Sequence, residues 1–199
     1  TDDPGPRRPL AAVLAAVGIP MFMVTLDNLV VTTALPVIRA ELNASLGDLQ
    51  WFVNAYTLSF ASLLLTASTL GDRMGRRRIF TAGIALFTLA SAACALATDP
   101  TMLVVARAIQ GFGAAAVMPL SLTLLTDAVP RRLRSAAIGI WGGVSGLGVA
   151  LGPLLGGAVV DGLSWQWIFW VNVPIGLLVL PLVVWALRDV RGGGRQLDP

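Results

Sequence analysis

Six long apolar segments separated by short polar connectors dominate this sequence. Each segment is about twenty residues or longer, which is the length an α-helix needs to cross the hydrocarbon core of a bilayer. The residues between them are too few to form a soluble domain, and 56% of the chain is hydrophobic against 13% charged. The first segment is also too long for the core of a signal peptide. We therefore expect an all-α integral membrane protein with transmembrane helices at residues 10–38, 49–70, 79–97, 102–129, 135–160 and 168–187.

The positions of the arginines predict how these helices are oriented. All fourteen basic residues are arginine, and twelve of them fall before the first segment, between the second and third, between the fourth and fifth, or after the sixth. Because positively charged loops stay in the cytoplasm, both termini are expected there, in the plasma membrane. We divide the chain into a cytoplasmic segment at 1–9, a six-helix transmembrane domain at 10–187, and a cytoplasmic linker or tail at 188–199.

The composition excludes several kinds of chemistry. The chain has no histidine, no lysine and one cysteine, Cys94. An ordinary zinc, haem, P-loop or Schiff-base site therefore has no residues to form it. We expect no enzymatic activity, no cofactor, no metal and no nucleic-acid partner. Cys94 lies in an apolar segment and is interpreted as a packing residue.

A glycine-rich stretch at 142–157 predicts close packing against a neighbouring helix. Gly148, Gly152 and Gly156 recur every four residues and so share one helix face. Pro153 and Gly157 make the segment a poor helix former in water, whereas a membrane tolerates such residues and a bare glycine face lets another helix approach closely. We assign these five residues to helix packing.

Two charged residues lie well inside the predicted helices, away from their ends. Asp27 is in the first and is followed by Asn28, with Thr25 and Thr32 nearby, and Arg107 is in the fourth, one turn before Gln110. A charge in the bilayer core costs about 2.5–3.5 kcal/mol or more, so both should face a polar interior. They could form a structural ion pair or carry a function.

Proton transfer is the function that these residue types favour. A carboxyl group away from water binds or releases a proton according to nearby charges, so a cationic substrate entering the cavity would favour loss of the proton from Asp27. Arg107, always charged, could bias the same equilibrium. Asn28, Thr32 and Gln110, together with Asn54 and Tyr56 of the second helix, are candidate cavity residues. Trp51 is expected to be an interface anchor.

The connector after the second helix reads Gly71-Asp72-Arg73-Met74-Gly75-Arg76-Arg77-Arg78. It could be no more than a tight basic turn. Alternatively, Asp72 faces the N-terminus of another helix or pairs with a local arginine. Asp127, late in the fourth helix, lies at the same level and could bridge to Arg73. An ionic latch of this kind suits a protein that opens alternately to each side.

These motifs together resemble the N-terminal six-span half of a major facilitator superfamily transporter, in the fourteen-span drug:proton antiporter branch. The resemblance rests on the following segments, in order: Leu26-Asp27 through Ala34-Leu35-Pro36; residues 68–77, with Ser68 where glycine is usual; Arg107-Ala108-Ile109-Gln110-Gly111 with Gly113; residues 148–157; and residues 165–176. It implies two inverted three-helix repeats and a role for Arg107 in proton transfer.

The family pattern also implies that a second six-span half is needed. Transporters of this type place two halves around a midplane site, so this chain would work as a homodimer or with a missing C-terminal half. In the homodimer, the glycine face of the fifth helix would pack against the second helix of the partner.

The function implied is proton-driven export of small lipophilic, often cationic compounds such as drugs or antibiotics. The alternatives are a structural or regulatory half-unit that transports nothing, and a facilitator or channel without proton coupling.

Overall fold

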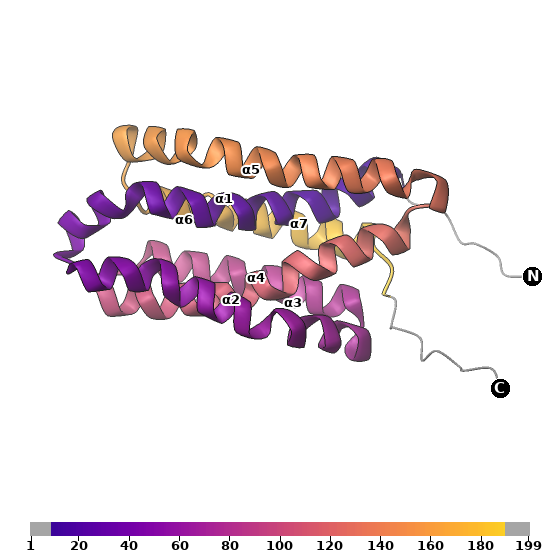
Figure 1. Ribbon diagram of the computed structural model, residues 1–199, viewed down its shortest axis with the longest axis horizontal. Coiled ribbons are helices and arrows are strands. Elements are labelled where there is room, and N and C mark those ends of the chain that lie inside the picture. Colours follow the sequence, from indigo (N-terminus) through magenta and orange to yellow (C-terminus); the bar gives the residue numbers. More distant parts are fainter. Residues whose placement is uncertain (1–8, 190–199) are drawn as a thin grey trace, which may run out of the picture.

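The computed structural model describes residues 9–189, which form a bundle of helices and contain no strand (Figure 1). The long helices are α1 (Leu10–Leu42), α2 (Leu46–Met74), α3 (Arg76–Ala95), α4 (Pro100–Ala128) and α5 (Arg134–Gly162), and a short 3₁₀ turn, Arg131–Leu133, precedes α5. The last span consists of α6 (Trp167–Trp170) and α7 (Asn172–Ala186). The segments predicted to flank the domain, 1–9 and 188–199, lie almost entirely outside the described residues.

Six helical segments in the described part of the chain are long and apolar enough to cross a membrane. They coincide with the six predicted segments within a few residues, and the predicted all-α membrane bundle is confirmed. In Figure 1 the start of α1, the turn between α2 and α3, the connection from α4 to α5 and the end of α7 lie at one end of the bundle. The arginine-rich connectors therefore share that end, which we call the arginine end.

Local sequence signals set where the helices begin and end. Ser45 and Asp48 form a capping box at the start of α2, with the Asp48 backbone N–H donating to Ser45 Oγ at 3.2 Å. Asp99 caps α4 by accepting from the Met102 backbone N–H at 2.9 Å. Gly75 separates α2 from α3 with a φ of +110°, a conformation that only glycine adopts without strain.

Helix α4 lies at the centre of the bundle and packs closely against α3. A Cβ atom added to Gly113 would lie 2.6 Å from the Phe87 backbone nitrogen and 2.8 Å from the Gly83 carbonyl oxygen. Gly83 of α3 faces Gly113 in the same contact, and a Cβ atom added to Gly83 would lie 2.9 Å from the Gly113 carbonyl oxygen. Because backbone atoms cannot move aside as side chains can, these two glycines set the separation of α3 and α4.

The glycine face of α5 packs against α1 of the same chain. Gly148 faces Thr25, Gly152 faces Leu29 and Gly156 faces Thr33, and an added Cβ would lie 3.3, 2.6 and 3.0 Å from their respective Cβ atoms. The prediction that this face contacts the second helix of another chain is therefore wrong. The sequence showed correctly that the face needs a helix neighbour, but its spacing could not identify which helix that is.

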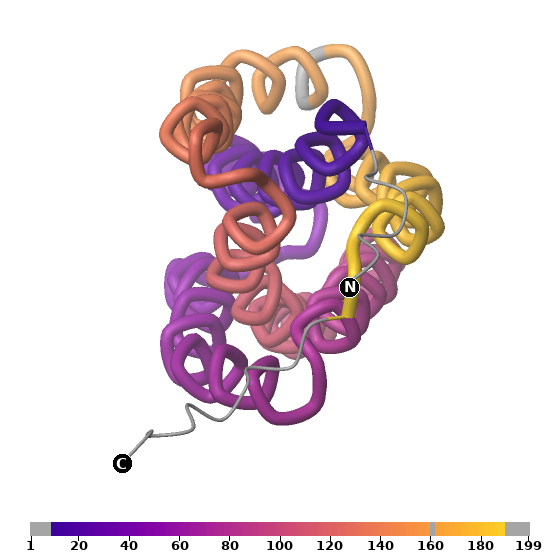
Figure 2. Tube along the Cα trace, turned by 90° about the vertical axis from the view of Figure 1, so that its right-hand side faces the viewer, coloured from indigo at the N-terminus to yellow at the C-terminus, as the bar shows by residue number. Residues whose placement is uncertain are grey.

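The opposite side of α5 remains uncovered. Added Cβ atoms at Gly139, Gly143, Gly146 and Gly157 would meet nothing within 4 Å, and Pro153 is exposed. Leu154 in α5 is 69% exposed and Leu65 in α2 is 80% exposed. Figure 2 shows α2 and α5 on the same side of the bundle, with α4 between them. In a membrane this side contacts lipid or another helical unit.

The two kinds of glycine predict different responses to the same substitution. Gly113→Ala should destabilise the bundle by about 1–3 kcal/mol because the new methyl group overlaps the α3 backbone. Gly146→Ala adds the same methyl group to the open side of α5 and serves as the control. Thermal unfolding in detergent measures both, and equal melting temperatures for the two variants would contradict the packing described here.

Candidate functional site

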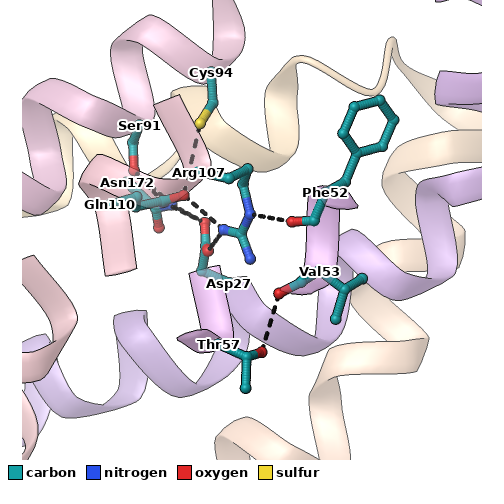
Figure 3. Close-up of polar contacts among 9 residues, drawn as sticks. All are labelled: Asp27, Phe52, Val53, Thr57, Ser91, Cys94, Arg107, Gln110 and Asn172. Atoms are coloured by element: carbon teal, nitrogen blue, oxygen red, sulfur yellow. Dashed lines mark hydrogen bonds and ion pairs between the residues drawn. The ribbon is translucent and has the colours of Figure 1, made fainter. Parts of the chain in front are cut away.

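Asp27 and Arg107 form an ion pair inside the bundle (Figure 3). Arg107 Nη1 lies 2.7 Å from Asp27 Oδ2, and both side chains are fully buried. A buried ion pair requires that further hydrogen bonds compensate for the loss of water. The expectation that both charges face a polar interior is confirmed, and they do so by facing each other.

Two amide side chains complete the surroundings of the carboxylate. Gln110 Nε2 donates to Asp27 Oδ1 at 3.0 Å and Asn172 Nδ2 donates to the same oxygen at 2.7 Å. Both amides also donate to Ser91 Oγ, at 2.7 and 3.3 Å. Asp27 therefore accepts from three side chains that belong to α4 and α7, with Ser91 of α3 joining the two amides.

Arg107 is held in place from three directions. Its Nε donates to the Phe52 carbonyl oxygen at 3.1 Å, and Nη1 also donates to Gln110 Oε1 at 2.6 Å. The Tyr56 ring lies 4.2 Å from Cζ, within the range of a cation–π interaction. The Nη2 group is buried and has no hydrogen-bond partner among the described residues, so both of its N–H donors are free.

Sequence reasoning identified part of this network, which we call the central network: Asp27, Arg107, Gln110, Asn172, Ser91, Tyr56 and the carbonyl of Phe52. Asp27, Arg107, Gln110 and Tyr56 were expected to be functional, and the structure brings them together. Ser91 and Asn172 were not. Asn172 carried a usable signal, since it is a strong hydrogen-bonding amide within the apolar stretch that begins the last span. Ser91 carried none.

The remaining predicted cavity residues lie outside the central network. Thr32 and Asn54 are exposed, and Thr32 Oγ1 donates to the Leu29 carbonyl oxygen of its own helix at 2.6 Å. Asn28 is partly buried, and its Oδ1 has no hydrogen-bond partner in the described part of the chain. Gln110 and Tyr56 are instead buried within the network. Trp51 is 53% exposed, as an interface anchor would be.

A second cluster lies at the arginine end. Arg76 contacts two carboxylates, Asp72 Oδ1 at 2.8 Å and Asp127 Oδ2 at 2.5 Å, and so links α2, α3 and α4. The predicted pairing of Asp72 with a local arginine is confirmed. The predicted bridge from Asp127 to Arg73 is wrong, because the first turn of α3 directs Arg76 toward Asp127, whereas Arg73 is exposed at the end of α2.

The same connector also holds the end of α7. Arg77 Nη1 donates to the carbonyl oxygens of Val184 and Leu187, at 3.1 and 3.2 Å. A cation at this position satisfies carbonyl groups that a helix C-terminus leaves unpaired. Gly71 packs against Leu120 of α4, and Gly75 lies beside the Asp189 carboxylate.

No metal site accompanies either cluster. In residues 9–189, no group of three or more His, Cys, Asp or Glu side chains is arranged to hold an ion. Cys94 Sγ lies 3.7 Å from Gln110 Oε1 and is buried at the edge of the central network.

Two relatives of this chain have names that refer to drug resistance and antibiotic export. It is 45% identical over 172 residues to Multidrug resistance protein Stp of Mycobacterium tuberculosis (strain CDC 1551 / Oshkosh), covering 86% of this chain and 32% of that protein. It is 47% identical over 173 residues to Cephamycin export protein CmcT of Amycolatopsis lactamdurans, covering 85% of this chain and 35% of that protein. The chain therefore spans about a third of the length of these curated relatives.

A solved structure shows the same fold. A bacterial homologue of the human lysosomal transporter Spinster, in an inward-facing and unoccupied conformation, superposes with a TM-score of 0.74 at 23% identity, covering 93% of this chain and 44% of that one. This confirms the predicted fold class, a six-helix major facilitator half.

The sequence also matches the profile of the Major Facilitator Superfamily over residues 17–199. The motifs, the six-helix bundle and these likenesses lead to one conclusion: the chain belongs to the major facilitator superfamily, as the N-terminal six-span half of a transporter related to the drug exporters.

Proposed function

We propose that this chain exports small lipophilic, often cationic molecules in exchange for protons, as one half of a two-half transporter. The observation that carries the proposal is the buried Asp27–Arg107 pair with its amide donors. Two relatives whose names describe multidrug resistance and cephamycin export support the substrate class. No cofactor takes part, and the energy comes from the proton gradient.

The central network supplies a chemical basis for exchange. In the arrangement described, Arg107 and two amides donate hydrogen bonds to the carboxylate of Asp27, and such contacts favour the ionised form of a carboxyl group. A conformational change that separates Asp27 from Arg107 leaves the carboxyl group without its cationic partner in a site away from water, and proton binding then neutralises it. Return of the cation, or arrival of a cationic substrate, releases the proton. The proton and the cation therefore compete for one carboxylate, and this competition is the requirement for antiport.

The second half is proposed to cover the side formed by α2 and α5, which are the two spans with the fewest buried residues in the described part of the chain. The cavity then lies between the halves, with Asn28, Thr32 and Asn54 on this side of it and the central network behind them. The second half is either another copy of this chain or a C-terminal six-span half. We propose that the arginine end, and with it both termini, faces the cytoplasm of a cell that carries this protein in its plasma membrane, because basic connectors are retained on the cytoplasmic side.

Arg76 is proposed to act as the latch of this transporter. It joins α3 to carboxylates on α2 and α4 at the arginine end, so opening of the bundle there has to break at least one pair. A partly exposed ion pair contributes little to overall stability. It is nevertheless well suited to bias an equilibrium between two states that differ by a small free energy.

The first test removes the proton-binding group. Proteoliposomes with an imposed pH gradient should accumulate ethidium through the intact transporter, whereas Asp27→Asn should reduce gradient-driven uptake to the level of protein-free vesicles. Asp99→Asn, the same change at the cap of α4, should leave uptake unchanged. Full gradient-driven uptake by Asp27→Asn would refute the proposal. Uptake that ignores the gradient in the unmodified protein would indicate a facilitator, and absence of uptake a non-transporting unit.

The second test concerns the latch. Asp127→Asn should slow ethidium uptake about threefold to tenfold, or ~0.7–1.4 kcal/mol, because one state loses an ion pair. Dependence on the pH gradient should persist, since the central network is intact. Asp127→Glu keeps the charge and should preserve most of the rate. Equal rates for Asp127→Asn and the unmodified protein would show that the cluster has no gating role.

The third test addresses the second half. We expect the purified chain to form a homodimer in detergent, so light scattering should give a protein mass of twice the 20.8 kDa of one chain. A stable monomer that transports only after co-expression with a C-terminal six-span half would instead assign that half as the partner.

A further inference from the structure

A pocket opens at the end of the bundle that lies opposite the arginine end. It has a volume of about 660 Å³ and lies between the end of α1 and the segment that joins α5 to α7. A volume of this size accommodates a drug-sized molecule or a lipid headgroup with part of its chain. We call it the outer pocket. Its lining consists of Glu41, Ser164, Gln166, Trp167 and Trp170, with Val173 and Pro174 from the first turn of α7.

The outer pocket has a fixed frame. Trp165 is fully buried, and its Nε1 donates to Glu41 Oε2 at 2.9 Å, which ties the segment before α6 to the end of α1. Trp165 also packs edge-to-face on Phe169, with ring centroids 6.2 Å apart. These contacts hold α6 so that Trp167 and Trp170 line the pocket, and Trp167 keeps 51% of its surface exposed.

The lining includes two side chains whose acceptor oxygens are not fully satisfied. Glu41 brings a carboxylate of which one oxygen is bonded to Trp165, leaving the other for a ligand. Ser164 adds a hydroxyl group. Gln166 Oε1 is buried and has no hydrogen-bond partner among the side chains that the structure describes, although a buried carbonyl oxygen of this kind is normally satisfied. None of the described residues that line the pocket is basic.

Together these features specify a cation. A carboxylate and an unsatisfied amide oxygen call for a positively charged group with N–H donors. Indole rings favour a cation at their faces and an apolar body against their edges. An anion would meet Glu41 with no compensating charge, and a neutral apolar molecule would leave Gln166 Oε1 unsatisfied.

We propose that the outer pocket is a binding site for an organic ammonium group that carries N–H donors on an apolar body. Glu41 provides the charge, rotation of the Gln166 side chain toward the pocket lets its Oε1 accept an N–H, and Trp167 and Trp170 contact the apolar part. The ammonium group belongs either to a lipophilic amine or to the ethanolamine headgroup of a phospholipid, because both present the same chemistry.

This site is separate from the central network. Glu41 lies about 20 Å beyond Asp27 along α1, at about 1.5 Å per residue. Binding in the outer pocket requires neither proton exchange nor a second half. The proposal therefore goes beyond the transport function, and the Asp27→Asn experiment and the one that follows succeed or fail independently.

Binding is measured by calorimetry on the full chain in detergent with three matched probes. Octylammonium has N–H donors and a charge, octyltrimethylammonium has the charge alone, and octanol has neither charge nor N–H donors. We expect octylammonium to bind saturably and more tightly than octyltrimethylammonium, and octanol not to saturate. Equal behaviour of octylammonium and octanol would mean that apolar partitioning explains all binding, and would overturn the proposal.

Substitutions test which side chains bind the ammonium group. Glu41→Gln removes the charge but keeps an oxygen for Trp165 Nε1, so the fold should be preserved while octylammonium binding weakens about tenfold or more. Gln166→Leu should weaken octylammonium more than octyltrimethylammonium. Asp99→Asn, which removes a carboxylate from the start of α4, is the control. Equal effects of Asp99→Asn and Glu41→Gln, or no effect of Glu41→Gln, would overturn the assignment.

Lipid nanodiscs distinguish the two sources of the ammonium group. If phosphatidylethanolamine lowers octylammonium affinity relative to phosphatidylcholine, and Glu41→Gln abolishes the difference, the natural ligand is the lipid headgroup. If affinity is equal in both lipids and still depends on Glu41, the natural ligand is a lipophilic amine. Loss of all Glu41-dependent binding in both lipids would refute the site in a membrane.

Discussion

The interaction on which this structure depends is the buried pair of Asp27 and Arg107. Neither charge could remain inside a bilayer alone, so α1 and α4 are required to meet at this level. The amides of Gln110 and Asn172 fill the remaining positions around the carboxylate and bring α7 to the same point. One electrostatic requirement therefore fixes the relative heights of three helices, and Ser91 of α3 joins them through its hydroxyl group.

Close packing around α4 turns this requirement into a rigid arrangement. Gly113 and Gly83 bring α3 and α4 within backbone contact, and Gly111 brings α4 against the Tyr56 region of α2. The Tyr56 ring thereby reaches the guanidinium group of Arg107. Small residues and the ion pair act together here. Without the glycines the helices would stand too far apart for the short side chains of Ser91 and Asp27 to share partners.

Much of the fold, and half of the site, could be predicted from the sequence. Hydropathy and length identify the six spans because the bilayer imposes one length on every helix. Charges inside the spans identify Asp27 and Arg107 because burial makes them costly. Ser91 could not be identified in this way, since the hydroxyl group of a serine can always donate a hydrogen bond to a backbone carbonyl of its own helix. Two further features could not be predicted for another reason. These are the contact of the α5 glycines with α1 and the pairing of Asp127 with Arg76 instead of Arg73. Both depend on how helices rotate about their axes, which a one-dimensional pattern leaves undetermined.

The contact between α1 and α5 has a consequence for how the two helices can move. Thr25, Leu29 and Thr33 are spaced by four residues, as are Gly148, Gly152 and Gly156, which receive them. The protruding side chains of α1 and the glycine positions of α5 thus repeat at the same interval of about 6 Å along parallel helix axes. Axial sliding of one helix over the other has to proceed in whole steps of this repeat, because intermediate registers force a side chain over a backbone ridge. Asp27 lies between Thr25 and Leu29 on α1. Its axial position relative to α5 can therefore change only in steps of about 6 Å.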